Sequence, residues 1–195
     1  MSEGTQNTEN ERMQVYMENL LVQDEDVREE DEFKAEALAV IIAIGRWIMQ
    51  NQQFLSDVGE WWARQDHGVT NIKRWQNETD QDVEVWKLDG GSARRDHYRI
   101  PPGQTLNADM WVPWANQPGT GHLRYGDHHA VIMVGGQPLA YFWQNGTLLR
   151  FNTNDAFVYG GVRVPGAAGA GGNRTMIIAT DPQGRKGFAL GTWKP

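Results

Sequence analysis

The stretch that decides the fold of this chain is Leu106-Asn107-Ala108-Asp109-Met110-Trp111-Val112-Pro113-Trp114. Its apolar residues recur at every second position, which is the period of a β-strand with one face turned to a core. Asn107, Asp109 and Trp111 take the other face, so a large aromatic side chain stands among polar ones. Because proline donates no hydrogen bond to a sheet, Pro113 predicts that this strand lies at a sheet edge or ends there.

The chain around this strand has the pattern of an all-β domain from about residue 68 to 195. The 9 Trp and 22 Gly of the sequence favour short strands joined by tight turns. Alternating segments on both sides of Asn145-Gly146 predict a hairpin with a type I′ turn at these two residues. No helical segment separates the strands, which excludes βαβ units. We expect an antiparallel β-sandwich of about nine to ten short strands.

The N-terminal third has helical rather than strand periodicity. Residues 1–32 form an acidic arm in which residues 11–22 are spaced as a short amphipathic helix. Residues 33–67 carry a wide apolar stripe typical of one long amphipathic helix or a helix pair. We therefore divide the chain into an acidic arm (1–32), a helical segment (33–67) and a β-sandwich domain (68–195).

Charge is concentrated in the arm. Residues 1–32 carry eleven acidic and two basic residues, whereas the other 163 residues are nearly neutral with fourteen acidic and sixteen basic residues. A nucleic-acid-binding protein needs a clustered basic face, so we expect no nucleic-acid partner. The sequence contains no cysteine, which excludes disulfides and thiolate metal sites.

The polar N-terminus resembles no signal peptide, and no stretch is long and apolar enough for a transmembrane helix. Location is therefore unknown from the sequence. The default expectation is the cytoplasm, or release by a non-classical route.

One dense polar segment, residues 121–129, could carry catalytic chemistry. His122, Asp127 and His128 could hold zinc or iron if the loop curls. The adjacent His128 and His129 would point to opposite faces of a strand, which argues against a shared metal. We expect no metal and no other cofactor, and name these three residues only as candidate ligands.

The aromatic residues give the stronger functional signal. An outward Trp111 near Arg99, Asn107 and Asp109 would form an aromatic platform with polar neighbours. Sugars bind such platforms, because their apolar ring faces stack on indole while their hydroxyls meet fixed polar groups. The full set of predicted ligand-binding residues is Trp111, Trp114, Tyr141, Trp143, Asn107, Asp109 and Arg99. Core packing is the alternative for each of these rings.

The segment Glu36-Ala37-Leu38-Ala39-Val40-Ile41-Ile42-Ala43, followed by an aromatic β-rich domain, resembles the actinoporins. That resemblance covers eight residues and the order of the elements. It implies a β-sandwich, pore-forming protein with an amphipathic N-terminal helix, and it carries over no site residue.

Three function classes remain open at this point. The first is a non-enzymatic, lectin-like recognition module that binds a glycan or a lipid surface through aromatic residues, including a toxin-like pore former. The second is a structural protein whose N-terminal helices dock on neighbouring subunits. The third and last is a His-dependent metalloenzyme. We expect a homo-oligomer, because the apolar stripe of the helical segment is wider than a coiled-coil seam.

Overall fold

The structure is a computed structural model that describes residues 28–51, 68–157 and 161–193. The chain divides into two compact units, Met1–Ala37 and Leu38–Pro195. The described strands all lie in the second unit, together with the helix from Leu38 onward. The predicted helix at residues 11–22 and residues 52–67 of the predicted helical segment lie outside the described residues.

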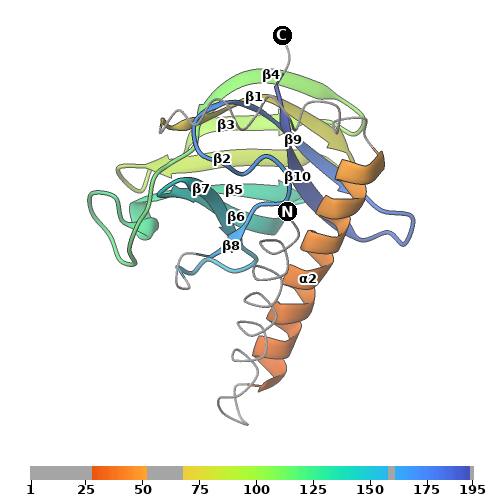
Figure 1. Cartoon of the computed structure of the whole chain (residues 1–195), viewed down its shortest axis with the longest axis horizontal. Helices are drawn as coiled ribbons and strands as arrows, with labels where there is room; N and C mark the ends of the chain where they lie inside the picture. Colours follow the sequence, from red (N-terminus) through yellow and green to blue (C-terminus); the bar gives the residue numbers. More distant parts are fainter. Residues whose placement is uncertain (1–27, 52–67, 158–160, 194–195) are drawn as a thin grey trace, which may run out of the picture. The chain divides into compact units, whose positions relative to one another are not determined.

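The described strands form two sheets, which confirms the predicted mainly β, sandwich-like fold (Figure 1). The four-stranded sheet has the order β10-β9-β1-β4, and the six-stranded sheet has the order β3-β2-β5-β6-β7-β8. The strands are β1 (Thr70–Glu78), β2 (Val83–Asp89), β3 (Arg95–Ile100), β4 (Thr105–Trp111), β5 (His128–Val134), β6 (Gln137–Asn145), β7 (Leu148–Asn152), β8 (Val162–Arg163), β9 (Gly172–Thr180) and β10 (Lys186–Thr192).

The main core lies between the two sheets. Trp75 of β1 is fully buried, and its ring centroid lies 6.4 Å from that of Phe142 on β6. Phe151 of β7 meets Phe188 of β10 edge to face, with 5.0 Å between ring centroids. Each pair joins one sheet to the other, so the large side chains that alternate inward hold the two layers together.

Strand β4 has the predicted alternation. Met110 is fully buried, whereas Asn107, Asp109 and Trp111 are exposed. β4 is an edge strand, as Pro113 indicated, and it pairs only with β1. It ends at Trp111 rather than at Trp114, because the chain beyond Pro113 crosses to the six-stranded sheet and pairs with β6.

One strand pairing and one turn differ from the prediction. β1 and β9 run parallel, although they are far apart in the sequence. The predicted hairpin joins β6 and β7, but Asn145 pairs with Leu148, so the turn residues are Gly146 and Thr147. Only Gly146 of these two has a positive φ, of 58°, and a type I′ turn requires a positive φ at both central residues. The predicted type I′ turn at Asn145-Gly146 is therefore wrong.

From Leu38 onward, helix α2 (Arg28–Asn51) packs on the outward residues of β9 and β10, and its Ile41 belongs to the main core. Ile44 and Ile48 are each 1% exposed and pack on Ile177, Ala179 and Ala189 of β9 and β10. A Cβ added at Gly187 would lie 2.6 Å from the Cβ of Ile44. Glycine therefore permits the close approach of β10 to the helix.

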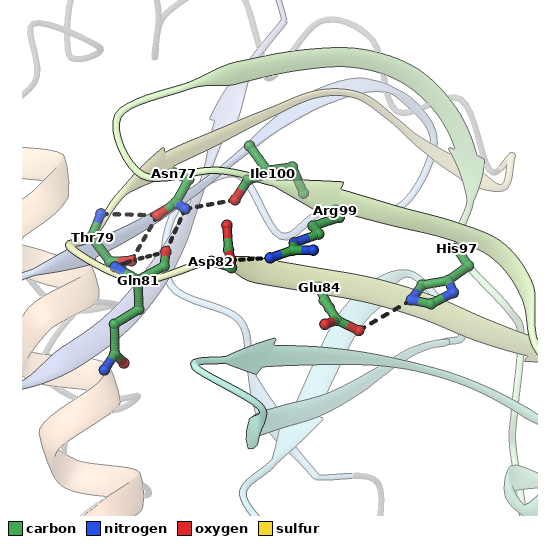
Figure 2. A network of polar contacts seen from close by, with 8 residues as sticks. All are labelled: Asn77, Thr79, Gln81, Asp82, Glu84, His97, Arg99 and Ile100. Atoms are coloured by element: carbon green, nitrogen blue, oxygen red, sulfur yellow. Dashed lines mark hydrogen bonds and ion pairs between the residues drawn. The ribbon is translucent and has the colours of Figure 1, made fainter.

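Polar contacts fix the turn after β1 and the neighbouring strands β2 and β3 (Figure 2). The Asn77 side-chain amide donates to the carbonyls of Gln81 and Ile100, at 2.8 Å each. This ties the end of β1 to the start of β2 and the end of β3.

Among the described residues, no helix has the length and hydropathy required to cross a membrane.

Candidate functional site

The outer face of the four-stranded sheet, away from the core, divides into a covered half and an open half. Helix α2 covers β9 and β10. The open half belongs to β1 and β4, and we call it the β1–β4 face. Its residues are Asn71, Lys73, Arg74, Asn107, Asp109 and Trp111, of which Asn71 is buried beneath the others at 1% exposure. Trp111 is 53% exposed, and the only other exposed large apolar side chain among the described residues is Val69.

The polar side chains of the β1–β4 face are bonded across the two strands. Asn71 donates from Nδ2 to Oδ1 of Asp109 at 2.7 Å, and the Lys73 ammonium forms an ion pair with the same carboxylate. Arg74 donates from Nε to Oδ1 of Asn107 at 3.2 Å. These bonds hold hydrogen-bonding groups in fixed positions along the strand that ends at Trp111.

Two features of this network bear on ligand binding. Hydrogen bonds from Lys73 and then from Asn71 lower the pKa of Asp109, so this carboxyl stays ionised below its ordinary range. The Oδ1 atom of Asn71 is buried and has no hydrogen-bond partner among the described residues. Asn71 is the register partner of Trp111. An unsatisfied acceptor thus lies beside the exposed indole, and such acceptors are uncommon in folded proteins.

Side chains of the six-stranded sheet anchor β4 from behind. Lys87 of β2 is buried, and its Nζ donates to the Trp111 carbonyl at 3.0 Å. Tyr98 of β3 donates from its hydroxyl to the Asp109 carbonyl at 3.2 Å. Both carbonyls point away from β1, because alternate residues of an antiparallel strand bond to opposite sides. The backbone of Asp109 and Trp111, whose side chains lie on the open face, is therefore held by hydrogen bonds from the other sheet.

Lys87 has two further partners that complete its hydrogen bonding. Its Nζ lies 3.1 Å from Oδ2 of Asp89 and 3.0 Å from Oδ2 of Asp96. The pairing of β2 with β3 shifts between Val85 and Lys87, and Asp96 in this irregular stretch has a φ of 45°. A bulge redirects the side chains of a strand, which accounts for a carboxylate aimed at the buried ammonium.

Arg99 and Trp114, both predicted as site residues, lie away from Trp111. Arg99 is on β3 of the six-stranded sheet, where its guanidinium pairs with Asp82, as Figure 2 shows. That hydrogen bond and the charge of Asp82 raise the pKa of Arg99. Trp114 is half-buried in a bridge with Gln144 of β6. The structure therefore groups only Asn107 and Asp109 with Trp111.

Tyr141 and Trp143 belong to a separate aromatic cluster on β6. Trp143 is fully buried, and its ring lies edge to face with Tyr125, with 4.9 Å between centroids. Tyr125 in turn stacks on His129 at 4.6 Å. Burial, followed by the nearby carboxylate of Asp155, raises the pKa of Tyr125, so its phenol stays protonated. Tyr141 is half-buried at the margin of this cluster.

The histidine segment forms the loop before β5 and the start of that strand. His128 is buried, and its Nδ1 lies 3.1 Å from the Arg124 carbonyl. Asp127 accepts a hydrogen bond from the Gly121 amide at 2.5 Å. The His122 ring lies 6.4 Å from that of His128, centroid to centroid. Among the described residues, no three His, Asp or Glu side chains are placed to hold a metal ion.

Sequence reasoning missed five residues of the site and its support. Lys87 had a readable signal, because it shares the parity of Val83 and Val85 and must face the core if β2 alternates. The other four are Asn71, Lys73, Arg74 and Tyr98. Their roles depend on which strands pair with β4 or face it from the other sheet, and no local pattern reveals that.

Comparison with protein-family models, with curated proteins and with solved structures finds no match to this chain.

Proposed function

We propose that this chain is a non-enzymatic carbohydrate-recognition module and that the β1–β4 face is its binding surface. The observation that carries the proposal is the exposure of Trp111, at 53%, beside a bonded set of amide, carboxylate and ammonium groups. An exposed indole offers a flat apolar surface to the carbon-bound face of a sugar ring. Asp109, Asn107 and Lys73 supply acceptors and donors for the hydroxyls.

A sugar suits this face better than a lipid surface does. Binding to a membrane interface requires several apolar side chains that insert together. Among the described residues, Trp111 and Val69 are the only exposed large apolar side chains. Polar groups bonded to one another surround the indole, and such groups match hydroxyls better than acyl chains.

A sugar also suits the face better than an added β-strand from another copy. An exposed edge strand can recruit a further strand through its free backbone groups. The outward carbonyls of Asp109 and Trp111 already accept from Tyr98 and Lys87. The apolar residues Ile44 and Ile48 of α2 are likewise buried against their own sheet. Neither feature calls for a second subunit.

The proposal is tested with a glycan array probed with the full chain and with three variants. Trp111→Ala should weaken binding by about tenfold or more, because the stacking surface is lost. Trp111→Phe keeps a smaller aromatic face and should bind with intermediate strength. Val69→Ala is the matched control, since it removes exposed apolar area at the start of β1 without touching the polar set.

Two results would contradict the proposal. One is a retained glycan whose binding is the same for wild type and Trp111→Ala. The other is the absence of any retained glycan. Trp111-dependent binding to phosphatidylcholine vesicles would then indicate a lipid-binding surface instead.

A further inference from the structure

We propose that the ligand of the β1–β4 face is an acidic oligosaccharide, whose anionic group pairs with Arg74 while a sugar ring stacks on Trp111. This inference depends on the proposed function and specifies its ligand class. It follows from the charges of the face, from the free donors of one guanidinium, and from the spacing between that guanidinium and the indole.

The six residues that define the β1–β4 face include two cations, Lys73 and Arg74, and one anion, Asp109. Glu78, exposed at the far end of β1, is a further acidic residue on this side of the sheet. Lys73 and Asp109 form an ion pair with each other. The hydrogen bond from Lys73 is the main reason for the lowered pKa of Asp109, so the carboxylate remains charged and continues to neutralise the ammonium. Arg74 is left as the excess positive charge of these six residues.

Arg74 has no acidic partner among the described residues. Its one hydrogen bond there runs from Nε to the neutral amide oxygen of Asn107. This bond uses only Nε and leaves both Nη groups as donors. Arginine with two parallel N–H donors matches the oxygen pair of a carboxylate or the oxygens of a sulfate. A neutral sugar would leave this charge unpaired.

The spacing between Arg74 and Trp111 requires an extended ligand. Arg74 is the register partner of Asn107, and Trp111 follows Asn107 by four residues on β4. At the rise of a β-strand, this corresponds to roughly 13 Å along the face. Asp109 lies between the two ends. A single sugar ring cannot stack on the indole and also bring its acidic group to the guanidinium, whereas an oligosaccharide can.

The test compares acidic oligosaccharides with the same molecules after the charge is removed. The probes are oligomers of galacturonate, alginate and hyaluronan, each beside its carboxyl-reduced counterpart, together with sulfated oligosaccharides and their desulfated forms. Titration calorimetry measures each pair with wild type, Arg74→Gln, Arg74→Lys and Trp111→Ala. We expect at least one acidic probe to bind about tenfold more tightly than its neutral counterpart.

The variants separate the charge of Arg74 from its geometry. Arg74→Gln should remove the preference for the acidic form, so that the acidic and neutral forms bind with similar, weaker affinity. Arg74→Lys should retain part of the preference, since it keeps a charge but not the paired donors. Trp111→Ala should weaken both forms. The pair that shows the preference identifies the anion as a carboxylate or a sulfate.

Failure of this inference differs from failure of the proposed function. If neutral and acidic forms bind equally and Arg74→Gln changes neither, the acidic ligand class is wrong and carbohydrate recognition stands. If no charged or neutral glycan binds, on the array or in titration, both proposals are wrong. Thermal unfolding is the control for folding. If Arg74→Gln unfolds at the same temperature as wild type, any change in its binding comes from the β1–β4 face.

Discussion

The two halves of the outer face of the four-stranded sheet differ in what covers them, and this difference separates a surface that stabilises the fold from the surface that we propose for recognition. On β9 and β10, the outward residues Ile177, Ala179 and Ala189 are small or branched and lie under α2. On β1 and β4, the outward residues are polar except for Trp111, whose apolar ring is exposed. The covered half contributes apolar burial, whereas the open half contributes groups that a ligand can reach.

The two halves also differ in the contacts that fix their strands. In the covered half, Gly45 and Gly187 allow α2 and β10 to pack closely together. The open half is held from behind, where Lys87 and Tyr98 of the other sheet bond to β4 carbonyls. Mutations in the covered half and behind β4 should therefore change stability, whereas mutations on the open face should change binding.

The largest stability effect is expected for Ile44→Ala. Ile44 is 1% exposed and packs in the cluster that joins α2 to β9 and β10. Truncating a buried isoleucine removes apolar burial and leaves a cavity, which costs about 2–5 kcal/mol. Urea denaturation measures the loss. Arg46→Ala, at an exposed position of the same helix, is the control and should stay within about 0.5 kcal/mol of wild type. If Ile44→Ala, like the control, also stayed within about 0.5 kcal/mol of wild type, α2 would not be docked in solution.

The next largest effect is expected for Lys87→Met. The substitution keeps most of the aliphatic chain and removes the ammonium that serves Trp111, Asp89 and Asp96. Leaving these acceptors without their donor should cost about 1–3 kcal/mol. Adding Asp96→Asn should recover part of the loss, because the double variant no longer leaves that carboxylate unpaired, and asparagine tolerates a positive φ. Strictly additive losses would show that Lys87 and Asp96 do not interact.

A smaller effect is expected for Gly45→Ala, which should lower the free energy of unfolding although helix propensity alone would raise it. Propensity alone predicts a gain of about 1 kcal/mol when alanine replaces a helical glycine. A Cβ at this position would lie 2.5 Å from the Pro165 ring and 2.8 Å from the Phe188 carbonyl oxygen. Relief of that overlap should produce a net loss of about 1–2 kcal/mol.

Ala43→Gly, at an exposed position of the same helix, measures propensity alone and should lose about 1 kcal/mol. A more stable Gly45→Ala protein in denaturant titration would place α2 farther from the sheet than the structure does.

Local sequence patterns predicted what they physically determine. Alternation placed Met110 inward and Trp111 outward, and the missing N–H of Pro113 indicated an edge. The helical period predicted a helix, although α2 begins at Arg28, before the expected residue 33. Each of these properties depends on neighbours within a few residues.

The remainder depends on contacts between distant segments. Tyr141 and Trp143 were predicted as ligand-binding residues, but Trp143 is fully buried because Tyr125, Ala115 and Phe157 pack around it. The partners of Asp109 come from β1, more than thirty residues earlier. Alternation fixes which face a side chain takes, and only the tertiary fold fixes whether that face is covered.

The most direct test of the account is a pair of calorimetric titrations with the strongest array glycan, using Ile44→Ala and Trp111→Ala at a temperature where both are folded. We predict that Ile44→Ala, although less stable, binds like wild type. We predict that Trp111→Ala unfolds within about 0.5 kcal/mol of wild type but binds about tenfold or more weakly. Unchanged binding by Trp111→Ala, or equal loss of binding by both variants, would contradict the separation of the two halves.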